Sequence, residues 1–181
     1  MQNAEKQLDS ARPLGLFGLA ATGVLAGAAI GAFTNLVNGL VSPTYFVNIM
    51  RWQNVDNVWR ASIAQGIFEG LIFGAILSLI FTSVVGVVSK ASCPYSVAVR
   101  HLFGILGAAL ICWVLGGLVA MGLATLSPEF YRNAFIGVPR DTGEMLKYAW
   151  VGGSISGIQI GGFICVILAS VLFRAKWRRQ T

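Results

Sequence analysis

The chain has little charge and few of the side chains that usually carry chemistry. Only 11% of its 181 residues are charged, against about 25% in a typical soluble domain, and 56% are hydrophobic. Its single histidine, His101, has no carboxylate near it in the sequence, and Cys93, Cys112 and Cys165 lack the spacing of a zinc site or a disulfide framework. We therefore expect no enzyme, no catalytic residue, no metal site and no cofactor.

The apolar residues are gathered into four long segments. They cover residues 14–40, 61–88, 101–126 and 148–173, and each holds about 20 or more mostly apolar residues, enough for a helix to cross a hydrocarbon core of roughly 30 Å. Lipid offers the backbone no hydrogen-bond partners, and the chain lacks the alternating pattern of a membrane barrel. The sequence therefore predicts an all-α integral membrane protein with four transmembrane helices.

The second half of the chain repeats the first. The matched pairs are Ser42/Ser127, Pro43/Pro128, Asn48/Asn133, Trp59/Trp150, Gly66/Gly157, Ile67/Ile158, Gly70/Gly161, Ile76/Ile167 and Leu77/Leu168. The offset grows from 85 to 91 residues because the later loop carries an insertion. Each half has two crossings, so both halves have the same orientation, and a symmetry axis would run along the membrane normal. We expect two tandem helical-hairpin repeats, residues 14–88 and 89–173, between tails at 1–13 and 174–181.

Lysine and arginine are divided unequally between the two sides of the membrane. Eight lie on the side that holds both termini and the 89–100 loop, and five lie in the other two loops. The positive-inside rule then places both termini in the cytoplasm, and we expect a bacterial cytoplasmic (inner) membrane. The net charge of +6 reflects this topology and does not indicate a nucleic-acid partner. The basic tail suits an interfacial anchor that attracts anionic lipids, through Arg174, Lys176, Arg178 and Arg179. A specific lipid or protein partner is the alternative.

Both outer loops are rich in aromatic residues and begin with a serine and a proline. Ser42 and Ser127 are placed to cap a helix, with Pro43 and Pro128 at its first position. Glu129 adds a favourable negative charge to a first turn. We expect a short interfacial helix in each outer loop, where aromatic side chains anchor the chain at headgroup depth. A gate or a partner surface is the alternative.

Small residues recur every four positions along the predicted spans. Between helices in lipid, small side chains allow the backbones to approach closely. We therefore expect helix-packing positions at Gly23, Gly27, Gly31, Gly66, Gly70, Gly74, Gly157 and Gly161. The spacing leaves open whether the partner helix belongs to the same chain or to another copy.

One carboxylate lies deep inside a predicted span. Glu69 is about nine residues, or roughly 13 Å, from the start of the second span, at a depth where an ionised side chain costs about 2.5–3.5 kcal/mol. Ser62 and Gln65 share its helix face, and Gln159 lies at nearly the same depth in the second half. We expect these four residues to form a polar pocket, for which two interpretations remain open. The pocket binds a proton or cation, or protonated Glu69 makes a hydrogen bond across a helix interface and stabilises packing.

Two functions remain open from the sequence. The first is a structural or accessory component that associates through its glycine-rich faces, as a homo-oligomer or as a subunit alongside other membrane proteins in the lipid bilayer. The second is a small ion, proton or solute channel or transporter that uses Glu69 with Gln65 and Gln159. Asn35 and Asn38 either extend such a polar route or cap and pack the end of the first span.

Overall fold

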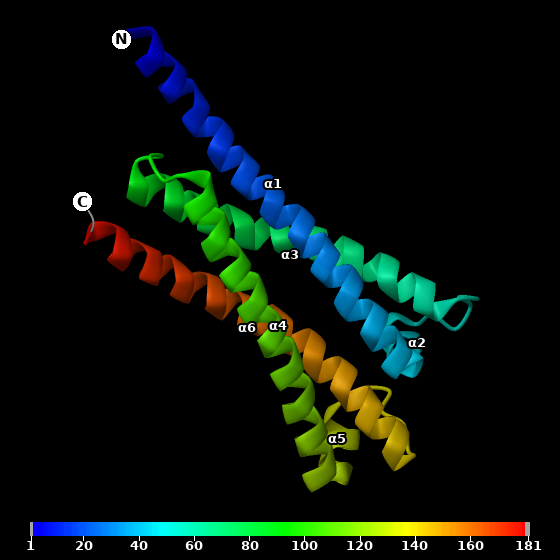
Figure 1. Cartoon of the computed structure of the whole chain (residues 1–181). Coiled ribbons are helices and arrows are strands. Elements are labelled where there is room, and N and C mark those ends of the chain that lie inside the picture. The colour runs from blue at the N-terminus through cyan, green and yellow to red at the C-terminus, as the bar shows by residue number, and fades with distance from the viewer. Residues whose placement is uncertain (1, 180–181) are drawn as a thin grey trace.

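The computed structural model describes residues 2–179, with side chains described from residue 14 onward, so the side chains of the predicted 1–13 tail lie outside it. The elements are α1 (Gln2–Val41), α2 (Pro43–Met50), α3 (Val58–Ser89), α4 (Tyr95–Leu126), α5 (Pro128–Ala134) and α6 (Thr142–Arg178) (Figure 1). Four helices of this described part are long and apolar enough to span a membrane: Leu14–Val41, Val58–Ser89, Tyr95–Leu126 and Thr142–Arg178. The prediction of four apolar helices in an all-helical chain is confirmed.

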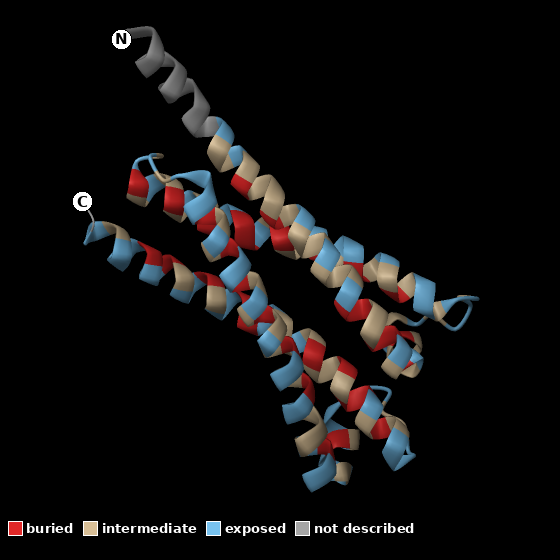
Figure 2. Ribbon diagram, viewed as in Figure 1, coloured by how far each residue is buried: buried red, intermediate tan, exposed pale blue. Residues whose placement is uncertain are grey.

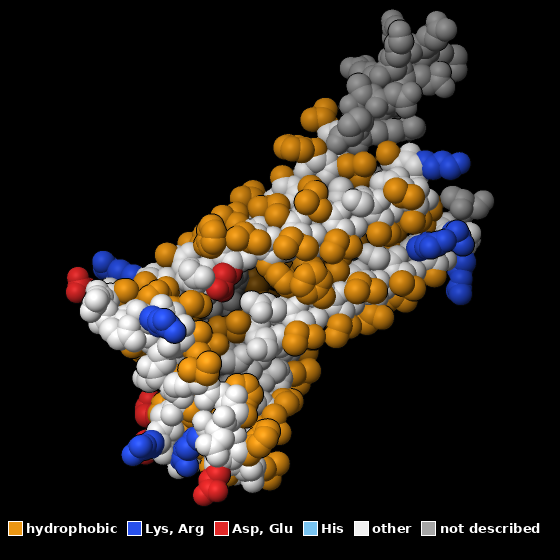
Figure 3. Space-filling model, turned by 180° about the vertical axis from the view of Figure 1, so that it is seen from behind, with side chains coloured by type: hydrophobic (Ala, Val, Ile, Leu, Met, Phe, Trp, Pro, Cys, Tyr) orange, Lys and Arg blue, Asp and Glu red, His pale blue; other side chains and the backbone are white. Residues whose placement is uncertain are grey.

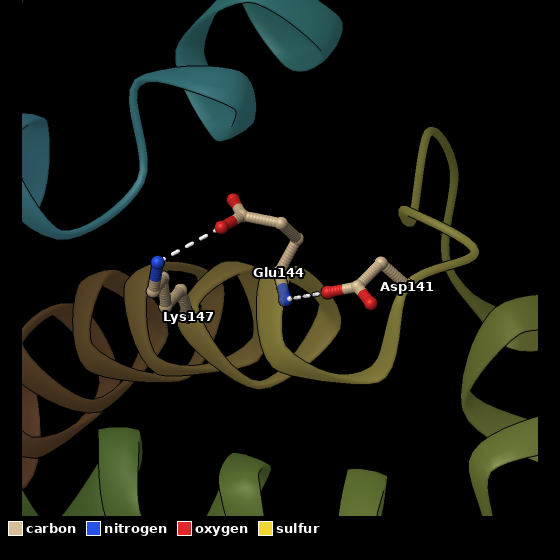
Figure 4. Close-up of polar contacts among 3 residues, drawn as sticks. All are labelled: Asp141, Glu144 and Lys147. Carbon is tan, nitrogen blue, oxygen red and sulfur yellow. Dashed lines mark hydrogen bonds and ion pairs between the residues drawn. The ribbon is translucent and has the colours of Figure 1, made fainter.

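Side chains at the starts of α3 and α6 supply the hydrogen bonds that a helix start lacks. Asn57 accepts from the backbone N–H of Arg60 at 2.9 Å. Asp141 accepts from the N–H of Glu144, also at 2.9 Å, and the Glu144 carboxylate pairs with Lys147 at 2.8 Å (Figure 4). Each cap satisfies a backbone donor that has no partner inside its helix. The two long helices that follow the outer loops therefore begin at defined residues.

The predicted caps of the two short helices are wrong. Ser42 and Ser127 precede α2 and α5, but neither side chain makes a capping hydrogen bond. Each serine is the single link between two helices, because its N–H completes the helix before it, bonding to Asn38 or Leu123, and its carbonyl begins the next. The backbone does the joining, and the Ser42 hydroxyl is buried without a partner among the described residues.

The four long helices pack as two pairs, α1 against α3 and α4 against α6. The predicted glycines of α1 lie against those of α3: a Cβ placed on Gly27 would be 2.6 Å from the carbonyl oxygen of Gly70 and 2.7 Å from the Cα of Gly74. Likewise, a Cβ on Gly116 of α4 would be 2.7 Å from the Cα of Gly157 in α6. These glycines therefore find their partner helix within the same chain.

The two pairs meet differently at their two ends. Figure 1 shows the start of α1, the end of α6 and the α3–α4 connection at one end, and α2 and α5 at the other. At the first end the contact is apolar, built from buried side chains such as Leu19, Phe81, Leu102 and Phe173. Figure 2 shows buried residues along the facing sides of the helices and exposed residues outside.

At the end that carries α2 and α5, polar contacts join the pairs. Ser154 of α6 donates to the side-chain oxygen of Asn38 in α1 at 3.1 Å. Asn48 of α2 donates to the carbonyl of Gly137, beyond α5, at 2.6 Å. These two bonds fix the position of the first pair relative to the second beside the outer loops.

Candidate functional site

A cavity of about 270 Å³ lies between the two helix pairs. Its wall is mostly apolar and includes Leu102, Ile105, Ile155 and Ile158. Its polar lining residues are Thr34, Asn35, Asn38, Gln65, Glu69, Ser78 and Gln159. Figure 3 shows a hollow between the helices on this face, beside hydrophobic side chains and an acidic one. Polar groups converging in a largely apolar cavity are typical of a ligand site.

Glu69 is held in place by its neighbour on α3. The Gln65 amide donates to one carboxylate oxygen of Glu69 at 2.8 Å, because residues four apart lie one above the other on a helix. Gln159 reaches the same cavity from α6, in the opposite helix pair. The structure thus brings three of the four predicted pocket residues around one space. Within the described structure, the other carboxylate oxygen of Glu69 has no hydrogen-bond partner.

Ser62, the fourth predicted pocket residue, lies elsewhere. It is fully buried at the contact of α1 with α3, where its hydroxyl donates to the carbonyls of Trp59 at 2.8 Å and Asn35 at 3.2 Å. It does not line the cavity. The helix periodicity placed Ser62 on the same face as Glu69. At Ser62, however, α1 packs closely on this face and covers the side chain. Ser62 therefore stabilises packing.

Asn35 and Asn38 are the site residues that the sequence left undecided. Their exposed fractions are 3% and 0%, and both line the cavity from α1. Within the described structure, the amide nitrogen of each has no hydrogen-bond partner, and neither does the indole nitrogen of Trp113 on the facing wall. The sequence signal for these two residues was a pair of side-chain amides three positions apart in an otherwise apolar span. Residues at this spacing lie on the same face of a helix.

Glu69 is the one acidic side chain among the described residues that line the cavity. Of the described residues that line the cavity, none is lysine, arginine or histidine, so no basic side chain neutralises the carboxylate there. Outside the spans, burial raises the pKa of Tyr45 in α2, and the negative charge of Glu69 raises it further. The Tyr45 ring packs on Tyr148 with ring centroids 5.0 Å apart. Tyr45 is therefore linked both to Glu69 and to the aromatic side chains at the start of α6.

Comparison of the chain with protein-family models, with curated proteins and with solved structures finds no match. Among the described residues, no group of three or more His, Cys, Asp or Glu side chains is placed to hold a metal ion. The function therefore has to be inferred from the geometry and chemistry of the cavity itself.

Proposed function

We propose that this protein is a small membrane channel or transporter that binds a proton or a small cation at Glu69. The observation that carries the proposal is the combination of an unneutralised carboxylate with the unpartnered buried amides of Asn35 and Asn38 on one cavity. A buried polar group without a partner costs about 1–3 kcal/mol, and membrane lipid supplies none. A proton or cation is attracted by the carboxylate, and water that enters the cavity beside it can accept from the amide N–H groups.

The residues divide the work by their chemistry. Gln65 orients the Glu69 carboxylate through the bond at 2.8 Å, so that the group does not have to rearrange when a ligand arrives. Gln159 offers an amide oxygen from the opposite helix pair. Ionisable side chains inside a membrane usually face a cavity and mark an ion or proton pathway. The absence of basic residues from the described wall favours a positive ligand over an anion.

The direct test is ion and proton flux in liposomes that contain the purified protein or its Glu69→Gln variant. Glutamine keeps the shape and one acceptor oxygen for Gln65 but removes the charge and the titratable proton. We expect flux to fall at least tenfold while oligomer size stays unchanged. The matched control is Glu129→Gln, which removes an exposed carboxylate from α5 and should leave flux unaltered. Unchanged flux in Glu69→Gln would refute the proposal.

A second candidate, an accessory subunit of a larger membrane assembly, is favoured by two glycines on α4. In the described structure a Cβ on Gly104 or Gly107 would meet no heavy atom within 4 Å. Backbone left uncovered in this way suits a close approach by a helix of another membrane protein. If this role is correct, Gly107→Leu should release a co-purifying protein from solubilised membranes while the purified chain remains folded. Retention of the partner would exclude this face.

We also propose that the helix pairs are tandem hairpin repeats with α2 and α5 as interfacial helices. Equivalent positions make the closest contacts in both pairs: Gly31 lies against Gly66, and its counterpart Gly116 lies against Gly157. Gly27 lies against Gly70, as Cys112 lies against Gly161. Both α2 and α5 begin with proline after the linking serine and carry aromatic residues. Such repeats typically place a site at their interface, where this cavity lies.

The proposed orientation has both termini in the cytoplasm of a bacterial cell. Support comes from the distribution of charge. In Figure 3 the described residues at the end that holds the termini show basic side chains without acidic ones, whereas the other end shows both kinds. Arg174, Lys176, Arg178 and Arg179 are all exposed there, where anionic lipid headgroups would meet them. The acidic side chains visible in the same view lie at the other end or in the middle.

A further inference from the structure

A second concavity, an apolar groove of about 550 Å³, runs between α4 and α6. Its floor includes Gly116 and Gly157, and its sides include Leu123, Ile160 and Ile164. These three side chains are among the exposed large hydrophobic residues of the molecule. At the outer end Tyr45 and Ile49 of α2 also contact it, but among the described elements no third long helix lines it.

The groove is the counterpart of the polar cavity in the other helix pair. On the first helix of each pair, the lining positions correspond at the 85-residue offset as Gly31/Gly116, Asn35/Ala120 and Asn38/Leu123. On the second helix, they correspond at the 91-residue offset as Gln65/Ser156, Glu69/Ile160 and Phe73/Ile164. The surfaces have the same position in each pair, but three of the four polar residues in this comparison, Asn35, Asn38 and Glu69, are replaced by apolar residues in the groove. The fourth, Gln65, is replaced by Ser156.

The cavity of the first pair is covered by the second pair. Phe73 lies against Gly162 of α6, where an added Cβ would be 2.9 Å from its ring, and meets Phe163 edge to face at a centroid distance of 5.0 Å. Asn38 accepts its hydrogen bond from Ser154 of the same helix. Within the chain, the second helix pair thus covers the surface of the first pair that corresponds to the groove.

We propose that the apolar groove is covered by a second copy of this chain, whose first hairpin docks on it as the second hairpin docks on the first. The proposal rests on the tandem-repeat correspondence and is independent of the transport role. Applying the offsets to the observed contacts predicts the contacts between copies. Phe73 against Gly162 becomes Ile164 against Leu71 of the second copy, and Asn38 against Ser154 becomes Leu123 against Ile63 of the second copy.

The surfaces that would meet are apolar and available. Leu71 is 37% exposed and Ile164 is 52% exposed. Since apolar surface gains little from leaving lipid, the contact must depend on close packing, which the glycine floor of the groove permits. The contact joins two different faces and is therefore heterologous. If each copy makes the same contact with the next one around an axis along the membrane normal, the copies close into a ring. The smallest such ring is a dimer.

Cross-linking between differently tagged copies tests the contact. In a background of Cys93→Ser, Cys112→Ala and Cys165→Ala, one copy carries Leu71→Cys and the other Ile164→Cys. Mild oxidation in native membranes should give a disulfide-linked heterodimer. The matched control replaces Ile164→Cys by Ile111→Cys, an exposed α4 position that does not line the groove, and should yield at least tenfold less.

The mass of the unmodified protein gives a test that is independent of the cysteine variants. The unmodified protein in lipid nanodiscs should have the mass of a dimer or a larger ring. A monomer at all protein concentrations, including one that retains a bound lipid in the groove, would overturn the proposal. An oligomer in which Leu71→Cys pairs equally well with Ile164→Cys and Ile111→Cys would also overturn it, because the copies would then meet through another face.

Discussion

The side chain and the backbone carbonyl of Asn35 differ in their hydrogen bonding. Its amide nitrogen has no partner within the described structure, whereas its backbone carbonyl accepts from Ser62 and so holds α1 to α3. The equivalent position in the other helix pair is Ala120. The side chain and the backbone of this residue therefore have separable roles.

This separation predicts opposite effects on stability and transport for Asn35→Ala. The change keeps the backbone bond to Ser62 and removes an unpartnered buried amide, so the free energy of unfolding should stay the same or rise by about 1 kcal/mol. Cation flux should fall several-fold, because a contact to the ligand is lost. Both quantities can be measured on the purified protein, by unfolding in detergent and by flux in liposomes.

The control for this prediction is Asn57→Ala, which removes the cap of α3. Loss of a cap costs about 1 kcal/mol, so this variant should be less stable but should conduct normally. If Asn35→Ala instead loses stability and retains its flux, Asn35 is a packing residue, and its proposed contact with the ligand is wrong.

At the scale of helices, the contact of α1 with α3 depends on backbone atoms that have no room to move. The nearest neighbours of a Cβ on Gly27 are the carbonyl oxygen of Gly70 and the Cα of Gly74, both main-chain atoms. A side chain could rotate away from an added methyl group, but a helix backbone has to shift as a whole. Even the smallest substitution there must separate the two helices.

Gly27→Ala and Gly104→Ala should therefore change stability in opposite directions. Alanine favours a helix over glycine by about 1 kcal/mol, and Gly104 faces open space in the described structure, so Gly104→Ala should be neutral or stabilising. Gly27→Ala should lose about 1–3 kcal/mol through overpacking. Reversible unfolding in mixed micelles gives both values. A shift of the same sign in both variants would contradict the packing described for α1 and α3.

At the scale of the whole molecule, Cys93 reports which side of the membrane the α3–α4 connection faces. It is the one cysteine outside the four predicted spans. In the proposed orientation, a membrane-impermeant maleimide should label Cys93 in inverted vesicles and leave it unlabelled in intact cells. Labelling from outside intact cells would reverse the orientation.

The rate of this labelling should depend on pH in a defined direction. Burial raises the pKa of the Cys93 thiol, and a backbone hydrogen bond from Ala98 offsets part of that rise. The reactive thiolate is therefore scarcer at neutral pH than in an ordinary cysteine, and its rate should keep increasing above the pH at which a free thiol levels off. Free cysteine in the same buffer is the reference, and an identical pH profile would contradict the burial.

The sequence could predict what depends on local pattern, but not what depends on how the helices cross. Apolar length predicted the four helices, and four-residue spacing placed Gln65 next to Glu69. The same spacing misplaced Ser62, because periodicity identifies a face without saying which neighbour covers it. The roles of Asn35 and Asn38 depend on the angle at which the helix pairs diverge, and no local signal encodes that angle. Ser42 failed as a cap because one residue had to join two helices.

The contact between the helix pairs is apolar at one end and hydrogen-bonded at the other, so the two ends should respond differently when the pairs move apart. Separation at the end that carries α2 and α5 breaks directional bonds such as those of Asn38 with Ser154 and Asn48 with Gly137, which weaken steeply once their alignment is lost. At the other end, side chains such as Phe81 and Phe173 can slide while they exchange one apolar neighbour for another. The end that carries α2 and α5 should therefore separate as a discrete, activated event, and the opposite end should separate gradually.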